Sequence, residues 1–264
     1  MKIGISTASL FVRKPTEDAL KFLSDNGVQT AEVFLETYSE YNGEFGKILK
    51  SVKGDTDIHS VHVLTTQFEP QLYSINERAQ DDSFKILDMA MQAGEEIGAK
   101  YYTFHGTARL KKTPFVINYD RVGNITQRII DCTKKHGITL AYENVHWSYY
   151  NYIGFFNEIR KRTTGLKGTL DIKQARQSGI HYSEFINEMA EDIVTVHLSD
   201  VDENGKMCLP GKGVTDFCDL FKRLNGVGFD GAFIIEAYKD DFKKEEELFE
   251  SVDFLKEVAV KTFR

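Results

Sequence analysis

Six short apolar segments of this sequence end in, or lead directly into, a side chain that could bind a metal ion or transfer a proton. Asp171 is typical: it interrupts the apolar run at the start of TLDIKQA, residues 169–175, where a strand should be buried. An ionised carboxylate removed from water costs free energy unless a cation or several hydrogen-bond donors compensate it. The six residues are His62 in SVHV, His105 in TFHG, Glu143 in AYENVH, Asp171 in TLDIKQ, His197 in VHLSD and Glu236 in IIEAY. If the segment ends meet in space, this placement predicts a functional site.

The last four of these residues form a donor set for a metal ion. Glu143, Asp171, His197 and Glu236 offer three carboxylates and one imidazole, which suit Mn²⁺, Co²⁺, Mg²⁺ or Zn²⁺ with positions left for substrate oxygens. A cation would also stabilise carboxylates that otherwise repel one another. Taken singly, each residue could instead cap a helix or hydrogen-bond a buried partner. Together, we expect them to hold one divalent metal ion.

Positioning these residues requires a regular alternation of strands and helices. Eight apolar runs of strand length alternate with segments whose apolar residues have helical spacing, and strands recur about every 33 residues. The strands are predicted at residues 2–7, 30–36, 58–64, 101–106, 138–144, 167–172, 193–200 and 232–238. No linker rich in Pro, Gly or Ser divides the chain, so residues 1–264 are expected to form a single (β/α)8 TIM barrel, an α/β fold with its active site at the C-terminal ends of the strands. An open doubly wound sheet is the alternative.

Composition narrows the class of protein. The chain is 41% hydrophobic and 28% charged, as expected of a globular domain with a sizeable core. Its net charge of −7 argues against a nucleic-acid partner, because binding to phosphate backbones usually needs a basic surface. The three cysteines form no CxxC pair, and no segment is typical of a signal peptide or membrane span. We expect a cytoplasmic protein.

Four motifs resemble a known family. AYEN, LDIKQA, VHLSD followed by LPGKGVTDF, and FIIEAY, at the ends of the fifth to eighth strands, are similar to the xylose isomerase-like superfamily, in particular its sugar phosphate isomerase/epimerase branch (AP endonuclease family 2). The resemblance implies that Glu143, Asp171, His197 and Glu236 are the metal ligands. It further implies that Glu143 and Glu236 form the catalytic acid/base pair.

Two departures from the family pattern bear on the activity. Many relatives have a histidine three residues after the strand-six aspartate, where this chain has Gln174. The DNA-repair branch has an Asp-x-His ligand pair after strand seven, where this chain has PGKG, residues 210–213. Both argue against a trinuclear zinc cluster, whereas a site for one metal ion remains complete.

Candidate substrate contacts are weaker. His62 and His105 could contact substrate or form structural hydrogen bonds. Trp147, in HWSYYNY, could pack on a sugar, although the same loop could be a stabilising cover or a subunit contact, which leaves a homo-oligomer open. Gln174 is a further candidate for contact with substrate. Basic residues that could neutralise an anionic substrate are Lys173, Lys212 and the group Arg109, Lys111 and Lys112.

The predicted function is that of a metal-dependent sugar or sugar-phosphate isomerase/epimerase acting by proton transfer through an enediolate. A dehydratase of the inosose type and a divergent hydrolase related to endonuclease IV are alternatives with the same metal. A non-catalytic sugar-binding barrel is an alternative of another class.

Overall fold

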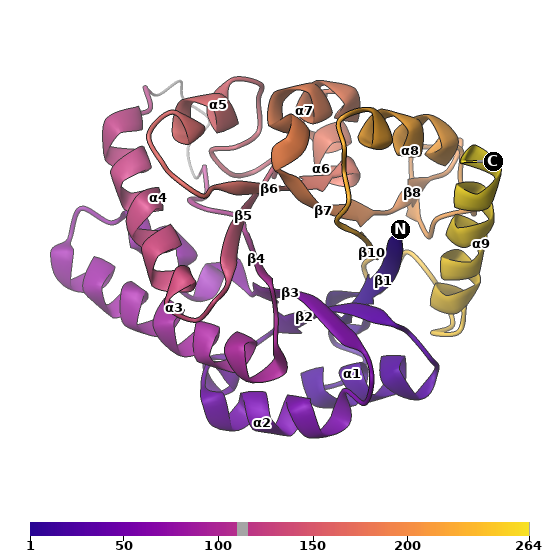
Figure 1. Cartoon of the computed structure of the whole chain (residues 1–264), viewed down its shortest axis with the longest axis horizontal. Helices are drawn as coiled ribbons and strands as arrows, with labels where there is room; N and C mark the ends of the chain where they lie inside the picture. Colours follow the sequence, from indigo (N-terminus) through magenta and orange to yellow (C-terminus); the bar gives the residue numbers. More distant parts are fainter. Residues whose placement is uncertain (110–115, 264) are drawn as a thin grey trace.

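Eight parallel strands close into a barrel, in the order β1-β10-β7-β6-β5-β4-β3-β2 (Figure 1). The computed structural model describes residues 1–109 and 116–263. The barrel strands are β1 (Lys2–Ser6), β2 (Thr30–Leu35), β3 (Asp57–Val63), β4 (Tyr101–Phe104), β5 (Thr139–Glu143), β6 (Lys167–Asp171), β7 (Ile193–Leu198) and β10 (Ala232–Ile235). The first strand pairs with the last, with Ile3 opposite Phe233. This closure confirms the predicted (β/α)8 barrel and excludes the open sheet.

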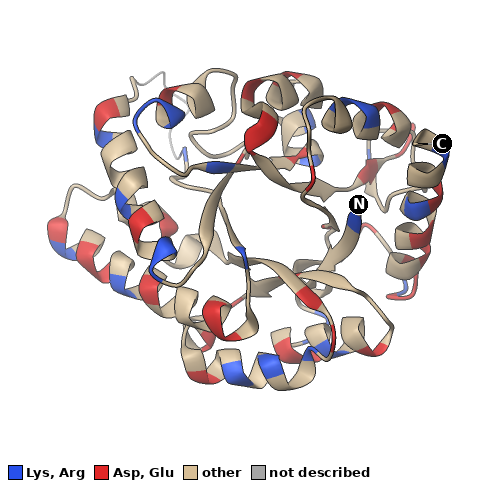
Figure 2. Ribbon diagram, in the orientation of Figure 1, with Lys and Arg blue, Asp and Glu red and all other residues tan. Residues whose placement is uncertain are grey.

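Helices fill the connections between strands and form the outer ring (Figure 1). The α-helices are α1 (Thr16–Asp25), α2 (Gly43–Val52), α3 (Glu77–Ile97), α4 (Tyr119–Lys134), α5 (Phe155–Arg160), α6 (Ile172–Gln177), α7 (Tyr182–Met189), α8 (Phe217–Gly226) and α9 (Glu247–Thr262). Short 3-10 helices are η1 (Thr7–Leu10), η2 (Tyr38–Glu40), η3 (Thr65–Gln67), η4 (Glu69–Tyr73) and η5 (Ala190–Asp192). Acidic and basic residues are spread over the outer helices (Figure 2).

Local structure differs from the sequence prediction in three places. Between β6 and β7 the chain forms two helices, α6 and α7, separated at Gly179, whose φ of 73° is the left-handed conformation that ends a helix. After β7 a small antiparallel pair forms, β8 (Asp200–Val201) with β9 (Met207–Cys208). Strands β4 and β7 each end two residues earlier than predicted and β10 ends three residues earlier, so His105 and Glu236 lie in the first positions of the loops after β4 and β10.

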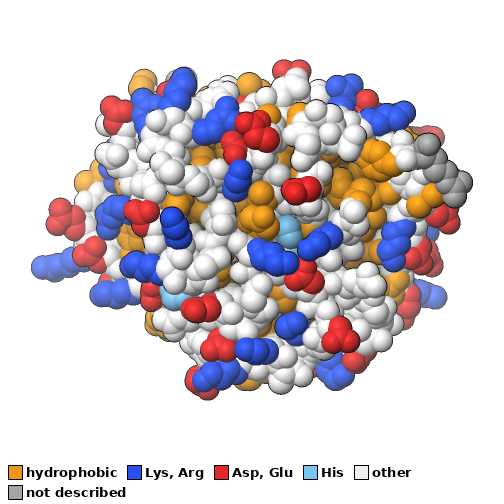
Figure 3. Space-filling view, viewed as in Figure 1, with side chains coloured by type: hydrophobic (Ala, Val, Ile, Leu, Met, Phe, Trp, Pro, Cys, Tyr) orange, Lys and Arg blue, Asp and Glu red, His pale blue; other side chains and the backbone are white. Residues whose placement is uncertain are grey.

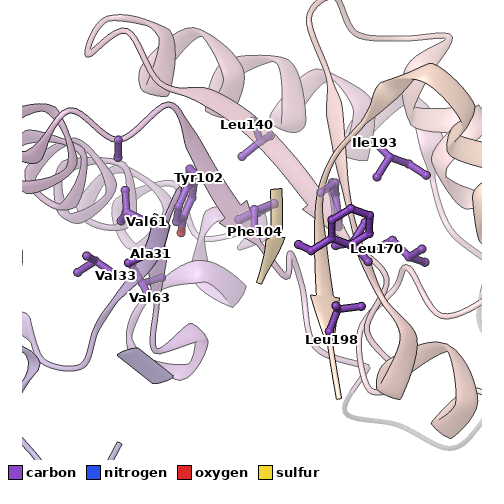
Figure 4. Close-up of a cluster of buried hydrophobic side chains, with 14 of the residues drawn as sticks. Ala31, Val33, Val61, Val63, Tyr102, Phe104, Leu140, Leu170, Ile193 and Leu198 are labelled. Carbon is purple, nitrogen blue, oxygen red and sulfur yellow. The ribbon is translucent and has the colours of Figure 1, made fainter. Parts of the chain in front are cut away.

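The hydrophobic core lies between the barrel and its helices. Successive side chains on a strand point to opposite faces, so Val61 and Val63 on β3, and Tyr102 and Phe104 on β4, face outward and are buried (Figure 4). On the helix side, residues at helical spacing such as Leu87 are fully buried against this layer. The alternate strand positions face the barrel interior, and these are the positions that can carry chemistry.

On the face shown in Figure 3, acidic, basic and hydrophobic side chains are intermingled. Among the described residues, no helix is long and apolar enough to cross a membrane.

Candidate active site

The four predicted metal ligands come together at the C-terminal end of the barrel. Glu143 and Asp171 are the last residues of β5 and β6, His197 is the fifth residue of β7, and Glu236 directly follows β10. All four are buried, and each offers one ligand atom within 4.8 Å of the others. Nδ1 of His197 lies 3.2 Å from Oε1 of Glu143, 3.3 Å from Oε2 of Glu236 and 3.9 Å from Oδ2 of Asp171. Four elements distant in sequence thus deliver one cluster.

Asp171 combines the two roles that its sequence position allows. Its Oδ1 accepts a hydrogen bond of 2.8 Å from the backbone N–H of Gln174 and caps helix α6. Its backbone is fixed by Asn144, whose side chain accepts from the Asp171 N–H at 2.8 Å and donates to its carbonyl at 2.9 Å. Oδ2 is left facing the cluster. One carboxylate oxygen of Asp171 therefore caps the helix, and the other oxygen remains part of the site.

The charges in the cluster are strongly coupled. Burial, helped by the nearby carboxylates of Glu143 and Glu236, raises the pKa of Asp171 to about 7, although the charge of Lys173 opposes the rise. Burial would also raise the pKa of Glu236, but the charges of His197 and Lys173 lower it to about 2. A site that holds several carboxylates so close together is chemically suited to a cation.

The donor set fits a divalent ion. Oε2 of Glu143 is buried and makes no hydrogen bond, although it lies 3.1 Å from Nε2 of His105. Because a buried carboxylate oxygen without a partner is costly, this atom is available to a ligand. Nε2 of His197 faces Glu32 at 3.2 Å, which leaves Nδ1 for the cluster, and a carboxylate behind a ligating imidazole is the usual arrangement at metal sites.

Glu32, in the middle of β2, is a member of the site that the sequence prediction missed. It is fully buried inside the barrel and accepts hydrogen bonds from Ser6 Oγ at 3.1 Å, Ser60 Oγ at 2.7 Å and Thr103 Oγ1 at 2.8 Å. Burial would raise the pKa of Glu32, but the charges of His197 and His62 hold it well below its usual value. The available signal was a charged residue at an inward-facing position within the apolar run TAEVFL.

His62 and His105 stand beside the cluster and contact each other, with 3.0 Å between their Nε2 atoms. Nδ1 of His105 lies against Thr65 Oγ1 and 3.5 Å from Oε2 of Glu69, a fully buried residue that the sequence prediction also missed. Burial would lower the pKa of His105, but the charges of Glu143 and Glu69 raise it to about 10. The two histidines therefore belong to the same charge network as the predicted ligands.

A cavity of about 310 Å³ opens onto the cluster. Its polar lining includes Glu143 and Glu236, and Phe11, Trp147 and Tyr238 form part of its apolar wall. His62, His105 and Gln174 also line it. A larger cavity of about 510 Å³ lies between α6, α7 and the β8–β9 pair, and none of the four predicted ligands lines it. The smaller cavity is the one in which the carboxylates can meet a substrate, because chemistry requires the reacting groups and not the larger volume.

The family model described as "Xylose isomerase-like TIM barrel" matches residues 20–258 of the chain, which include all four clustered residues. The chain belongs to the xylose isomerase-like TIM barrel family. A search of curated proteins found no match to the sequence.

Solved structures of several other proteins share the fold along nearly the whole chain. A D-tagatose 3-epimerase-like protein is 19% identical with a TM-score of 0.80, covering 99% of this chain and 98% of that one. D-psicose 3-epimerase from Clostridium cellulolyticum H10 is 12% identical with a TM-score of 0.78, covering 100% of both chains. 3-Keto-D-glucoside 4-epimerase from E. coli is 14% identical with a TM-score of 0.75, covering 97% and 99%. At these identities the likeness establishes the fold.

Gln174 is held in place at the cavity wall. Its Oε1 accepts hydrogen bonds from the backbone N–H of His146 at 3.2 Å and from Nδ1 of the same residue at 2.6 Å. The amide group of Gln174 is thereby oriented by the loop after β5, next to Trp147. Its predicted contact with substrate stays a prediction.

The predicted basic contacts are placed very differently from one another. Lys173 is buried, with Nζ 3.7 Å from Oε2 of Glu236. Lys212 is on the surface, where Nζ pairs with Oε2 of Glu250 at 3.0 Å, and it does not line the 310 Å³ cavity. Arg109 does not line this cavity either, while Lys111 and Lys112 lie outside the described residues. Of the described members of this group, Lys173 is the one that lies beside the four predicted metal ligands.

Proposed function

We propose that this protein is a metal-dependent sugar isomerase or epimerase that acts by proton transfer. The observation that carries the proposal is that Glu143 and Glu236 line one cavity and also belong to the four-residue group able to hold a metal ion. Membership of the xylose isomerase-like family, and structural neighbours that are sugar epimerases, support a carbohydrate substrate.

Glu143, Asp171, His197 and Glu236 would hold the metal. Once bound, a divalent cation supplies Lewis-acid stabilisation of the negative charge that develops on substrate oxygens when the neighbouring C–H loses its proton. The metal is one of Mn²⁺, Co²⁺, Mg²⁺ or Zn²⁺, all of which accept this mixed oxygen and nitrogen donor set.

The two glutamates would move the proton. One removes it from the carbon next to the carbonyl, giving an enediolate, and the other acid returns a proton to the same carbon or to its neighbour. Return to the same carbon from the opposite face gives an epimer, and return to the neighbouring carbon gives an isomer. Phe11, Trp147 and Tyr238 would cover the apolar faces of the sugar and exclude water.

The substrate is proposed to be a sugar with a carbonyl next to a carbon that bears both a hydroxyl and a hydrogen. Among the described residues that line the 310 Å³ cavity there is no lysine or arginine, and the carboxylates there are those of Glu143 and Glu236. A phosphate or carboxylate on the substrate would therefore have to extend beyond this cavity to find a cation.

Solvent deuterium incorporation tests the proposal. Metal-stripped protein is reloaded with Mn²⁺, Co²⁺, Mg²⁺ or Zn²⁺ and incubated in D₂O with a panel of ketoses, keto-inositols and their phosphates. We expect deuterium on the carbon next to the carbonyl of the substrate that is turned over, and loss of exchange with a chelator. Product without deuterium would indicate a hydride shift, an enone or diketone chromophore would indicate a dehydratase, and metal binding without turnover would indicate a sugar-binding barrel.

A further inference from the structure

Lys173 is a buried lysine whose ammonium group makes no hydrogen bond. The residue is 2% exposed, and its Nζ has no hydrogen-bond partner in the described structure. Nζ lies 3.7 Å from Oε2 of Glu236 and 4.0 Å from Oδ2 of Asp171. It also lies 3.9 Å from the centre of the Tyr238 ring, and the residue lines the 510 Å³ cavity. An ammonium group in this position is held by charge and by the aromatic face, not by directed hydrogen bonds.

Burying an ammonium group costs free energy. Removing an ammonium ion from water costs several kcal/mol even after relaxation, and that cost is offset only by nearby opposite charges. Here the offset comes from two of the four residues that form the metal-ligand cluster, Asp171 and Glu236. Lys173 and a bound metal ion would therefore interact with the same two carboxylates.

The formal charges show how Lys173 and a metal ion would each change the net charge of the site. Glu143, Asp171 and Glu236 together carry −3 when ionised, with His197 as a neutral ligand. A divalent ion reduces the total to about −1, and the Lys173 ammonium reduces it to about zero, so that the loaded centre is close to neutral. Without a metal, Lys173 is the one lysine or arginine in the described chain that lies within ion-pair distance of these carboxylates.

We propose that Lys173 is a built-in counter-cation of the metal centre, which stabilises the metal-free site by contacting Asp171 and Glu236 and lowers its affinity for the metal. This inference rests on the metal centre of the proposed function. The competing explanation is that Lys173 only fills space beneath Tyr238, in which case the ammonium charge itself would matter little. The two explanations predict different effects of removing the charge: tighter metal binding if Lys173 is a counter-cation, and unchanged metal affinity if it only fills space.

The test is a substitution that keeps the stem of the side chain and removes its charge. For Lys173→Met we expect the metal-free protein to unfold about 10 °C lower, because a buried ion pair has lost one partner. We expect Co²⁺ to bind roughly tenfold more tightly, because a neighbouring positive charge is gone. Unfolding midpoints of chelator-treated protein and competition with a chromophoric chelator measure the two effects.

Lys14→Met is the matched control. Lys14 also pairs with a carboxylate, Glu245 at 2.9 Å, and also lies over an aromatic ring, that of Phe22 at 4.8 Å, but it is not part of the cluster. We expect its loss to leave the Co²⁺ dissociation constant unchanged. An equal change in Lys14→Met and Lys173→Met would mean that net charge alone controls affinity, which would refute the proposal.

A double substitution keeps the test decisive if Lys173→Met folds poorly. In metal-free protein, Lys173→Met combined with Glu236→Gln should be much more stable than the sum of the two single effects predicts, because the carboxylate that faces the ammonium is removed with it. Additive effects would refute the pairing.

The metal measurements separate the two proposals. Wild-type protein that binds none of Mn²⁺, Co²⁺, Mg²⁺ and Zn²⁺ would refute the proposed function and, with it, the role of Lys173 as a counter-cation. Tight binding by wild type, with unchanged or weaker binding by Lys173→Met, would refute the counter-cation alone.

Discussion

The two ends of the barrel both bury ionisable side chains, but they treat them differently. Near the start of β3, His59 Nε2 contacts the carbonyl of Val194 and Oγ1 of Thr195, both at 3.0 Å. At the C-terminal end, Glu143 Oε2 and Lys173 Nζ have no hydrogen-bond partner in the described structure. Most buried polar groups in proteins are hydrogen-bonded, so charged groups without such partners, gathered beside a cavity, point to a functional site.

The pKa values of two buried histidines express the same difference. Burial lowers the pKa of His59 to about 4, so the ring stays neutral in the folded protein. Burial acts in the same direction on His105, but the charges of Glu143 and Glu69 raise its pKa to about 10. The N-terminal end of the barrel therefore tolerates a histidine as a neutral hydrogen-bonding group, whereas the C-terminal end accumulates charge.

The largest expected effect comes from the C-terminal end of the barrel, where buried charged groups lack hydrogen-bond partners. Glu143→Gln and Glu236→Gln should each reduce deuterium exchange about 10³-fold at saturating metal, because an amide cannot accept the proton. The unfolding midpoint of the metal-free protein should fall, because the charge of Glu143 is stabilised by His105 and His197, and that of Glu236 by His197 and Lys173. Exchange rates and thermal unfolding measure the two outcomes. If either variant kept roughly a tenth of the exchange rate, that glutamate would not be an essential acid or base.

His59 should make the folded protein less stable at acidic pH. Its pKa is about 4 in the folded protein and about 6.5 when unfolded, so the unfolded state binds more protons between these values. The free energy of unfolding should therefore fall as pH falls from about 6.5 to 4, by up to about 3 kcal/mol. Urea unfolding across this range measures it.

His59→Gln is the control for this pH effect. The variant has no titrating ring, so the difference in unfolding free energy between wild type and variant should change across the same window. A difference that does not vary with pH would show that His59 is not held neutral by burial, and the contrast between the two ends would fail.

A substitution of Gln174 tests whether this residue of the cavity wall contributes to substrate binding. Gln174→Ala removes the acceptor for two hydrogen bonds from His146, and we expect KM for the turned-over sugar to rise about tenfold with a smaller change in kcat. Gln177→Ala is the matched control, since Gln177 is exposed on the same helix. Equal KM values for the two variants would exclude Gln174 from substrate binding.

The barrel and the candidate ligands could be predicted because each depends on local signals that repeat. All eight predicted strands are present, and the clustering of Glu143, Asp171, His197 and Glu236 follows from closing a barrel whose strand ends share one rim. The later end predicted for β10 reflects the residues Ala237 and Tyr238 in IIEAY, which continue the strand-like pattern past Ile235, where β10 ends.

Glu32 and Glu69 could not be found by the same reasoning, because it considered only strand ends. Glu32 lies in the middle of β2, and its meaning depends on Ser6, Ser60 and Thr103 from three other strands. Glu69 lies in the 3-10 helix η4, and Tyr102 donates to its carboxylate at 2.5 Å. Both roles are set by tertiary contacts that no local pattern records.

The smallest expected effect comes from the exposed ions at the N-terminal end. Asp57 pairs with Lys2 and Lys100, each at 2.9 Å, and these side chains are 40–48% exposed. Lys2→Met should cost only about 0.5 kcal/mol of unfolding free energy, because solvent screens the pair and Lys100 still faces Asp57. Urea unfolding at low and high salt measures this cost, which should shrink as salt rises.

This small effect sharpens the comparison between the two ends. Lys2 and Lys173 are both lysines beside carboxylates, but only Lys173 is removed from water. A loss of several kcal/mol in Lys2→Met would mean that the exposed ions hold the barrel closed, and burial would no longer explain the difference. A small loss, set against a large one in Lys173→Met, would show that the free energy of an ion pair here depends on its exclusion from solvent and not on its distance.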